Sequence, residues 1–346
     1  MLALAMLLAV QFTPDQPELR YRQPQLATGD GMVALTFVAG RPAFSVHVAV
    51  SRDQGRSFTQ PVKVAQPGFV SMGRHRGPRV AVADGAIVAA ACVGLKPPAS
   101  KMDLMAWRSS DGGVTWSPGV RINDAPGSTG EGFFGMTARG KLVLAVWLDV
   151  RRSGGNVYLS KSTDGGATWS ANRQVYQSPE GHVCECCHPT VRIGAGGQVF
   201  LMWRNWLNGS RDMYLGTSTD GGETFRVEKL GQGAWPLNAC PQDGGDLALD
   251  SRGNVVTVWR RADAVFLARP GQAEEELGKG TDPAVAVGPG DRIYAAWGTP
   301  EGLKLRVAGK PATGLGEHSG FVSFTVADSV IAAWENQGAV VVDRLP

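Results

Sequence analysis

The feature that most constrains this fold is an eight-residue segment that occurs four times along the chain. Its fullest example reads Ser-Ser-Asp-Gly-Gly-Val-Thr-Trp over residues 109–116. Residues 51–58, 162–169 and 218–225 follow the same template, Ser-x-Asp-x-Gly-x-Ser/Thr-aromatic. The central aspartates of the four octets are 58, 53 and 56 residues apart. A repeat at this spacing indicates one supersecondary unit that the chain builds several times.

The composition of the octet favours a hairpin turn. Asp and Ser side chains accept hydrogen bonds from nearby backbone N–H groups, and Gly adopts the positive φ of a tight turn. The closing Trp or Phe is expected to fill an apolar slot between strands. A calcium-binding loop is the alternative, but the octets lack the alternating acidic ligands and the terminal Glu that such a loop uses.

A second repeat extends the first. Short apolar strands end at equivalent positions in seven units, at Phe37, Cys92, Trp147, Trp203, Trp259, Trp297 and Trp334. Each unit opens fourteen residues earlier (thirteen in the first), at Pro24, Pro78, Phe133, Pro189, Gly245, Pro283 and Gly320. No long amphipathic helical pattern interrupts these strands. We therefore predict an all-β propeller of seven four-stranded blades, with the octets in the first four blades and six blades as the alternative.

The units are expected to form a single domain over residues 11–346. The last unit shows three strands, so a strand from residues 8–20 is expected to complete its sheet and remove an exposed edge. Residues 1–10 contain an apolar run that is too short to span a bilayer. This run has the character of a secretory signal, and a buried strand is the alternative. We expect a monomer that is exported to the periplasm or out of the cell.

The charge of the chain argues against a nucleic-acid partner. The net charge is +3 over 346 residues, and no long basic run occurs. Phosphate-binding loops, zinc-protease motifs and nucleophile elbows are also missing from the sequence.

Charged residues recur at equivalent places in the repeat. In a propeller the first strand of each blade lines the axis, and the residues before it share one face with the loop after the second strand. At these places stand Arg22, Arg76, Glu131, Asp149, His188, Arg204, Asp243 and Arg260. We expect them to form a polar cleft on one face of the ring.

The densest cluster of reactive side chains reads His-Val-Cys-Glu-Cys-Cys-His-Pro over residues 182–189, with Cys240 in the following unit. Three interpretations remain open. Cys184, Cys186, Cys187 and Cys240 form disulfides of unknown pairing, as is common in exported proteins. Alternatively Cys184, Cys186, Cys187 and His188 hold a soft metal ion. The third possibility is a nucleophilic cysteine. Cys92 stands apart at a core position, as an inert buried thiol.

The octet is the Asp-box, or bacterial neuraminidase repeat, and the chain resembles the Asp-box β-propellers, whose best-known enzymes are the sialidases. That family opens its first blade with Phe/Tyr-Arg-Ile-Pro, and the Arg holds the substrate carboxylate. Residues 21–24, Tyr-Arg-Gln-Pro, match three of the four positions. The resemblance implies that Arg22, Arg204 and Arg260 grip a carboxylate, with Arg76 as a further candidate. The family's nucleophile is a tyrosine, and the five tyrosines here fall within expected strands or outside that register.

Two main functions follow. The first is a glycoside hydrolase that acts on an anionic glycan, with Asp149 and Glu131 as the paired carboxylates. The arginines, Asp243 and His188 then bind the substrate, and no cofactor is needed. The second is a non-catalytic propeller that binds a glycan or a protein, or that assists assembly. A metal-binding periplasmic protein is a third possibility, and it depends on the cysteine cluster.

Overall fold

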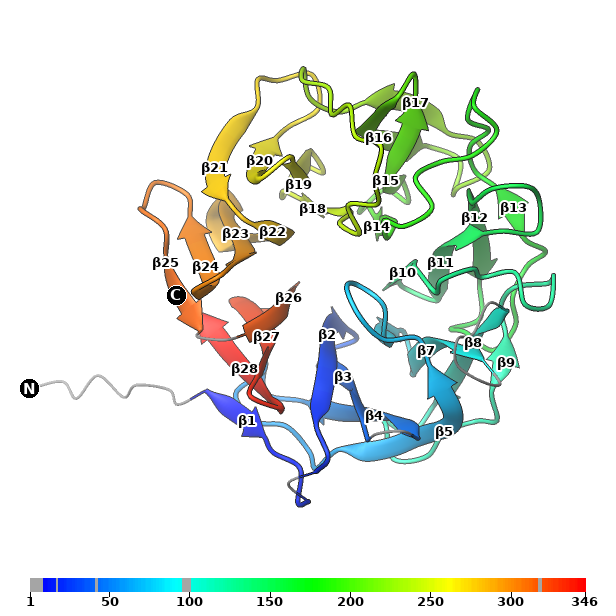
Figure 1. The fold of residues 1–346 in the computed structure, drawn as a ribbon. Helices are drawn as coiled ribbons and strands as arrows, with labels where there is room; N and C mark the ends of the chain where they lie inside the picture. Colours follow the sequence, from blue (N-terminus) through cyan, green and yellow to red (C-terminus); the bar gives the residue numbers. More distant parts are fainter. Residues whose placement is uncertain (1–8, 17, 41–42, 95–100, 317–318) are drawn as a thin grey trace, which may run out of the picture.

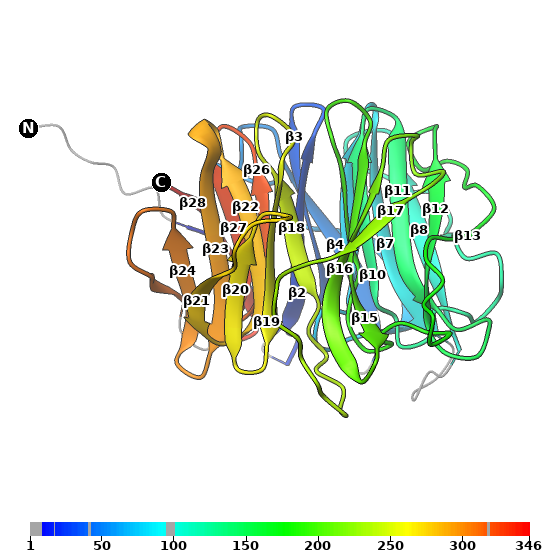
Figure 2. The ribbon, with the colours of Figure 1, turned by 90° about the horizontal axis from the view of Figure 1, so that it is seen from above.

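The chain folds into a ring of antiparallel sheets around a central axis, which confirms the predicted all-β propeller (Figure 1). The computed structural model describes residues 9–16, 18–40, 43–94, 101–316 and 319–346. Seen edge-on, the strands run between the two faces of the ring (Figure 2). Within the described ranges the one helical element is the 3-10 turn η1 (Pro289–Asp291), and none of their helices has the length and apolar character needed to cross a membrane.

Each repeat unit has four strands, which are ordered from the axis of the ring to its rim. The first two units comprise β2 (Tyr21–Gly29), β3 (Met32–Ala39), β4 (Phe44–Ser51), β5 (Val62–Val70), β6 (Arg79–Ala83), β7 (Ala86–Gly94), β8 (Met102–Ser109) and β9 (Val120–Arg121). The next two comprise β10 (Phe134–Arg139), β11 (Leu142–Asp149), β12 (Asn156–Ser162), β13 (Arg173–Gln174), β14 (Thr190–Ile193), β15 (Val199–Leu207), β16 (Ser210–Ser218) and β17 (Arg226–Lys229). The last three comprise β18 (Gly245–Leu249), β19 (Val255–Arg261), β20 (Ala264–Ala268), β21 (Glu275–Lys279), β22 (Thr281–Gly288), β23 (Arg292–Thr299), β24 (Gly302–Val307), β25 (Thr313–Gly316), β26 (Ser319–Val326), β27 (Val330–Asn336) and β28 (Ala339–Leu345).

The division into sheets differs from the expected one. Five sheets of the described chain are separate four-stranded blades, whereas β2–β9 form one eight-stranded sheet. The first two units merge because β5 runs on past β4 and pairs antiparallel with β7, through Phe69 with Gly94 and Val70 with Val93. The prediction of seven separate blades, or of six, is therefore wrong in this respect: the structure has five free-standing blades.

The ring closes between the two ends of the described chain. Strand β1 (Val10–Phe12) pairs antiparallel with β28, so that Val10 lies opposite Val342. This strand lies within the range that the sequence indicated for the closing strand. The expected signal-like or buried segment at residues 1–10 lies mostly outside the described residues.

The core lies between neighbouring sheets. Trp147, Trp203 and Phe37, which mark the ends of second strands in the repeat, are fully buried. Cys92 at the matching position is also buried, and burial raises the pKa of its thiol to about 12. The thiol is therefore protonated at neutral pH and behaves as an apolar core group.

The repeated octets form tight turns between third and fourth strands. In the second octet the Ser109 hydroxyl donates to Asp111 Oδ1 and accepts a bond of 2.8 Å from the Gly113 amide. Asp111 also accepts bonds from the amide and hydroxyl of Thr115, and these lower the pKa of Asp111. The octets after β4, β12 and β16 repeat this bonding.

Two properties of a glycine in this turn, its positive φ and its close contact with the neighbouring unit, should contribute separately to stability. Gly166 has φ +86°, and an added Cβ would lie 2.4 Å from Val88 Cγ2 in the neighbouring unit. We expect Gly166→Ala to lower the free energy of unfolding by about 2–4 kcal/mol, from backbone strain together with overpacking. Chemical denaturation measures this.

The matched control is Gly221→Ala in the fourth octet. Gly221 also has a positive φ, +69°, but an added Cβ there meets nothing within 4 Å. This variant should lose about 1 kcal/mol, from the backbone alone. Equal losses in the two variants would show that contact with the neighbouring unit is unimportant.

Candidate functional site at the axial mouth

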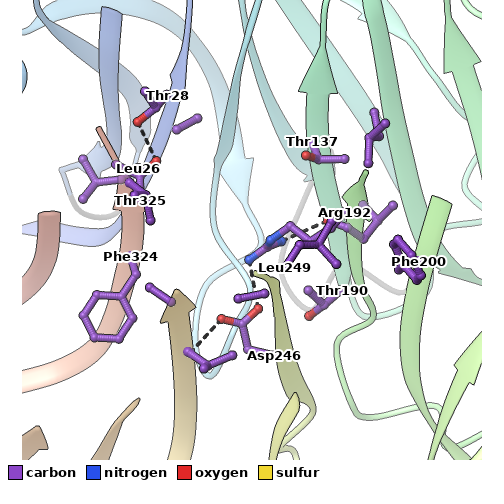
Figure 3. A pocket seen from close by; sticks show the side chains of 18 of the residues that line it. Leu26, Thr28, Thr137, Thr190, Arg192, Phe200, Asp246, Leu249, Phe324 and Thr325 are labelled. Atoms are coloured by element: carbon purple, nitrogen blue, oxygen red, sulfur yellow. Dashed lines mark hydrogen bonds and ion pairs between the residues drawn. The ribbon is translucent and has the colours of Figure 1, made fainter. Parts of the chain in front are cut away.

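A polar cavity of about 610 Å³ runs along the axis of the ring. The innermost strands line it, and many of their side chains bond to each other (Figure 3). Arg192 donates to Asp246 Oδ1 at 2.9 Å, and the hydroxyls of Thr28 and Thr325 are 2.7 Å apart. The charged side chains labelled in Figure 3, Arg192 and Asp246, therefore bond to each other. We accordingly looked for a reactive site at the ends of this axial cavity, which we call the shaft.

At one end, residues from four different units meet around His75. This residue belongs to the loop before β6, which reaches toward the centre of the ring (Figure 1). The His75 ring stacks on the His188 ring with centroids 3.9 Å apart, and it lies 4.8 Å from the Phe321 ring. Both histidines line the cavity, so this contact forms the boundary between the shaft and the axial mouth.

Two carboxylates accompany His75. His75 Nε2 donates to Asp282 Oδ1 at 2.8 Å, and Asp243 Oδ2 accepts the Asp282 amide at 2.9 Å. One ligand atom each of His75, Asp243 and Asp282 lies within 4.8 Å of the others. We call these three residues the mouth cluster. Such a group is compact enough to hold a cation or to exchange a proton.

The pKa values of the two carboxyl groups in the mouth cluster are shifted in opposite directions. Burial and the charge of Asp282 raise the pKa of Asp243 to about 6, against its ordinary 3.8. Burial also acts to raise the pKa of Asp282, but the hydrogen bond and charge of His75 outweigh it and lower that pKa. A pair of carboxyls with split pKa values is typical of sites that move protons.

The backbone at this mouth is strained. Four of the non-glycine residues with positive φ lie just before a first strand or at the bulge near its start: Gln23, His75, Gln242 and Asp282, with φ from 51° to 56°. Two of them belong to the mouth cluster, and Gln242 directly precedes Asp243. Strain of this kind costs about 1–3 kcal/mol per residue and gathers at functional sites.

Several buried polar atoms around the cluster have no hydrogen-bond partner among the described residues. They are Asp243 Oδ1, His188 Nδ1 and Arg260 Nε. A buried polar atom without a partner costs about 1–3 kcal/mol, so this concentration of them at one place marks a site built for a further group.

The comparisons with known proteins place this chain in a family. The sequence pattern of the BNR repeat-like domain matches residues 26–176 and 99–240. The chain belongs to the BNR repeat-like family. No curated protein sequence matches the chain.

Solved structures share the fold of this BNR repeat-like protein at low identity. A protein of unknown function from Dyadobacter fermentans has a TM-score of 0.57 and 16% identity, with 98% of this chain and 99% of that chain covered. A Hadza microbial sialidase has a TM-score of 0.55 and 16% identity, over 94% of this chain and 66% of that one. An α-L-arabinanase from Penicillium chrysogenum has a TM-score of 0.54 and 16% identity, with 97% of both chains covered. These likenesses show the propeller fold alone.

The structure brings part of the predicted site together. Asp243 and His188 lie in or against the mouth cluster, and Arg260 Nη1 is 3.5 Å from Asp243 Oδ2. Arg204 is almost fully buried, and it donates to the backbone oxygens of Asp243, Arg260 and Arg211. Arg204 therefore supports the loop that carries Asp243, and its guanidinium is already occupied by carbonyl groups.

Other predicted residues lie outside the cluster. Arg76 pairs with Glu131, whose side chain is 57% exposed, and the Arg76 guanidinium lies over the Phe133 ring. Arg22 is half-buried, and its positive charge favours the ionised form of Glu335, against the effect of burial on the pKa of that carboxyl. Glu335 accepts a hydrogen bond from the Gln23 amide.

Asp149 has a supporting position. Its side chain is fully buried and accepts five hydrogen bonds, from Ser128, from Trp147 and three from Arg151. Both oxygens are occupied, so the carboxylate does not face a substrate. The sequence could not show this, because the three donors converge on Asp149 only in the folded ring.

The expected disulfides are not formed. Cys184, Cys186, Cys187 and Cys240 are all free thiols in the structure.

Sequence reasoning missed Asp282. This residue stands directly before Pro283, in the place that Gln23 holds before Pro24. A register shift between Thr281 and Ala284 turns it to the mouth. An X-Pro step opens four of the seven units, at Pro24, Pro78, Pro189 and Pro283, and was the available signal for Asp282.

Removal of the Asp149 carboxylate should destabilise the fold. We expect Asp149→Ala to lower the free energy of unfolding by about 3 kcal/mol, because Arg151 and Trp147 lose a buried partner. Chemical denaturation measures the effect. The exposed Asp84 gives a control, Asp84→Ala, which should change little. A loss in Asp149→Ala no larger than in Asp84→Ala would contradict the supporting role.

The raised pKa of Asp243 predicts a dependence of stability on pH. Between pH 3.8 and about 6 the unfolded chain releases this proton while the folded chain keeps it. Stability therefore falls as pH rises through this window, and the contribution is constant above it. In Asp243→Asn this loss should be absent, so the variant gains relative to the parent up to about pH 6.

Denaturation curves across that pH range check this prediction, with Asp84→Asn as the control. His75, Asp282 and Arg260 are the charged or titratable groups that face Asp243, so their protonation acts on the same curve. Parallel curves for the parent and Asp243→Asn would contradict a raised pKa.

Proposed function

We propose that this protein is a glycoside hydrolase that binds a carbohydrate at the axial mouth and cleaves it there. The observation that carries the proposal is the mouth cluster, in which the pKa of Asp282 is lowered while that of the neighbouring Asp243 is raised to about 6, so that Asp282 is the member available as an ionised carboxylate. The family and the propeller fold, which sialidases and arabinanases share, are consistent with this function.

The proposed roles follow from exposure and bonding. The side chains of Asp282 and His75 are each 12% exposed, so they are the members of the cluster that reach a ligand. Asp282 acts as the carboxylate that activates water or attacks the anomeric carbon. His75 Nε2 donates to Asp282 Oδ1 and orients this carboxylate at the mouth. Asp243 is fully buried and is a positioning residue.

An acidic sugar is the proposed substrate class. Arg22 and Arg76 stand at equivalent points of the repeat, Arg260 Nη1 is 3.5 Å from Asp243 Oδ2, and Arg74 is exposed beside His75. Arginine is suited to a planar carboxylate because two of its N–H groups bind both oxygens. Glu131, which pairs with Arg76, is the further carboxylate to test at this face. The bonding of Asp149 assigns it to support of the fold and not to catalysis.

The test is hydrolysis of a panel of chromogenic glycosides, acidic and neutral, with and without a chelator. Asp282→Asn should lower kcat/KM at least a hundredfold, which is the usual size of an acid–base contribution, while glycan binding stays within a few fold. Asp84→Asn is the matched control and should retain full activity.

The outcomes separate the functions. Glycan binding by the parent without turnover would overturn hydrolysis and favour the non-catalytic propeller. Turnover that survives Asp282→Asn but is lost in Glu131→Gln would move the chemistry to the Arg76–Glu131 pair. Loss of melting temperature in Asp282→Asn would show that its effect is structural.

A further inference from the structure

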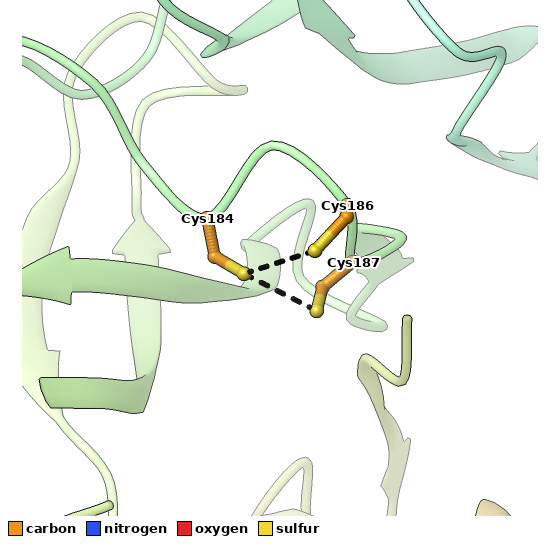
Figure 4. Close-up of side chains that lie close together, drawn as sticks. All are labelled: Cys184, Cys186 and Cys187. Carbon is orange, nitrogen blue, oxygen red and sulfur yellow. Dashed lines mark hydrogen bonds between the residues drawn. The ribbon is translucent and has the colours of Figure 1, made fainter. Parts of the chain in front are cut away.

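A second group of reactive side chains lies beside the mouth cluster. Cys184, Cys186 and Cys187 belong to the loop between β13 and β14, and their sulfur atoms turn toward one another (Figure 4). Cys184 Sγ is 3.3 Å from Cys187 Sγ and 3.8 Å from Cys186 Sγ. All three sulfurs lie within 4.8 Å of each other, and all three residues are at least 98% buried.

This spacing fits a thiolate–metal centre. With metal–sulfur bonds of about 2.3 Å, the sulfurs of a tetrahedral site stand about 3.8 Å apart. A disulfide, in contrast, joins two sulfurs at about 2.0 Å and leaves a third without a role. Here three sulfurs converge on one point, and a bridge between any two would leave the third buried beside it.

The proposed fourth ligand is Cys240, from another loop. It lies between β17 and β18, outside the group of three sulfurs that are within 4.8 Å of one another, and a hydrogen bond with Cys240 contributes to the raised pKa of Cys186. In contrast to the other three, Cys240 is exposed. A metal ion can therefore arrive from solvent through Cys240 and pass to the buried sulfurs.

Two arginines offset the negative charge of the thiolates. Arg211 Nη1 donates to Cys184 Sγ at 3.0 Å, and the Arg211 Nε donates to the Leu237 carbonyl three residues before Cys240. Arg204, whose carbonyl accepts the Cys184 amide, adds a second positive charge nearby. Arg211 thus orients a ligand and joins the two loops, as partners of metal ligands commonly do.

We propose that Cys184, Cys186, Cys187 and Cys240 bind one soft d10 metal ion, Cu⁺ or Zn²⁺, with the negative charge of the thiolates offset by Arg204 and Arg211. Soft thiolates favour these ions over hard cations such as Mg²⁺ or Ca²⁺. Binding releases the thiol protons to solvent. His188 is not a ligand, because its ring stacks on His75 at the mouth.

The experiment titrates the reduced full-length protein with Zn²⁺, and separately with Cu⁺ under anaerobic conditions, each against a chromophoric competing chelator. We expect one ion per chain in at least one of the two series. The difference between the series identifies the ion. Alkylation of the thiols before titration should abolish binding, and glycosidase activity is not part of the measurement.

Three variants make the test specific. Cys240→Ser should weaken binding at least tenfold, and it is the decisive variant because an exposed residue can be replaced without loss of the fold. Arg211→Met should weaken binding about ten- to a hundredfold, the usual effect of removing a partner of a ligand. Cys92→Ala removes a thiol from the core elsewhere and should bind as the parent does. Circular dichroism checks that each variant is folded.

Three results would overturn the proposal. The first is binding of less than half an equivalent of both ions, Zn²⁺ and Cu⁺, by the reduced parent. The second is unchanged binding in Cys240→Ser. The third is a count of three or fewer thiols in freshly isolated protein that is denatured without reductant, since the cluster would then hold a disulfide. Five thiols and one bound ion support the metal site even if no glycoside is hydrolysed.

Discussion

The structure depends on the burial of both faces of each sheet between its neighbours. Trp147 and Trp203 are fully buried in the packing between successive units, and the alanines of β7 fill the narrower inner space. Because this apolar packing uses the faces of the sheets, charged side chains remain at the strand ends and along the axis. The ring thereby gathers residues that are far apart in sequence, such as His75 and Asp282, 207 positions apart, at one place.

The mouth combines features that each cost stability. The mouth brings together in space the positive φ values of His75 and Asp282, the buried carboxyl of Asp243 and several polar atoms without a partner. A purely structural channel would not need this combination, because hydroxyls and paired ions such as Arg192 with Asp246 already satisfy the shaft below. The cost is understandable if a ligand completes the site.

The local parts of this fold could be predicted from the sequence. The octets form turns through hydrogen bonds among their own residues. The aromatic residues that end the second strands are buried because each packs against the adjacent unit. The pairing of β5 with β7 could not be predicted, since it depends on how far one edge strand extends toward the next. Asp149 was misjudged because charge at an equivalent repeat position does not reveal how many donors surround it. Asp282 was missed because the repeat was aligned without the bulge near the start of β22.

The pairing of β1 with β28 joins segments more than 300 residues apart, since Val10 lies opposite Val342. The last sheet therefore stays incomplete until nearly all of the chain has been synthesised. Until β28 has been made, β1 has no partner strand, and its edge is open to other chains in the cell. Three residue pairs join β1 to β28, and this short pairing closes the ring. Mechanical or thermal opening of the ring is therefore expected to begin there.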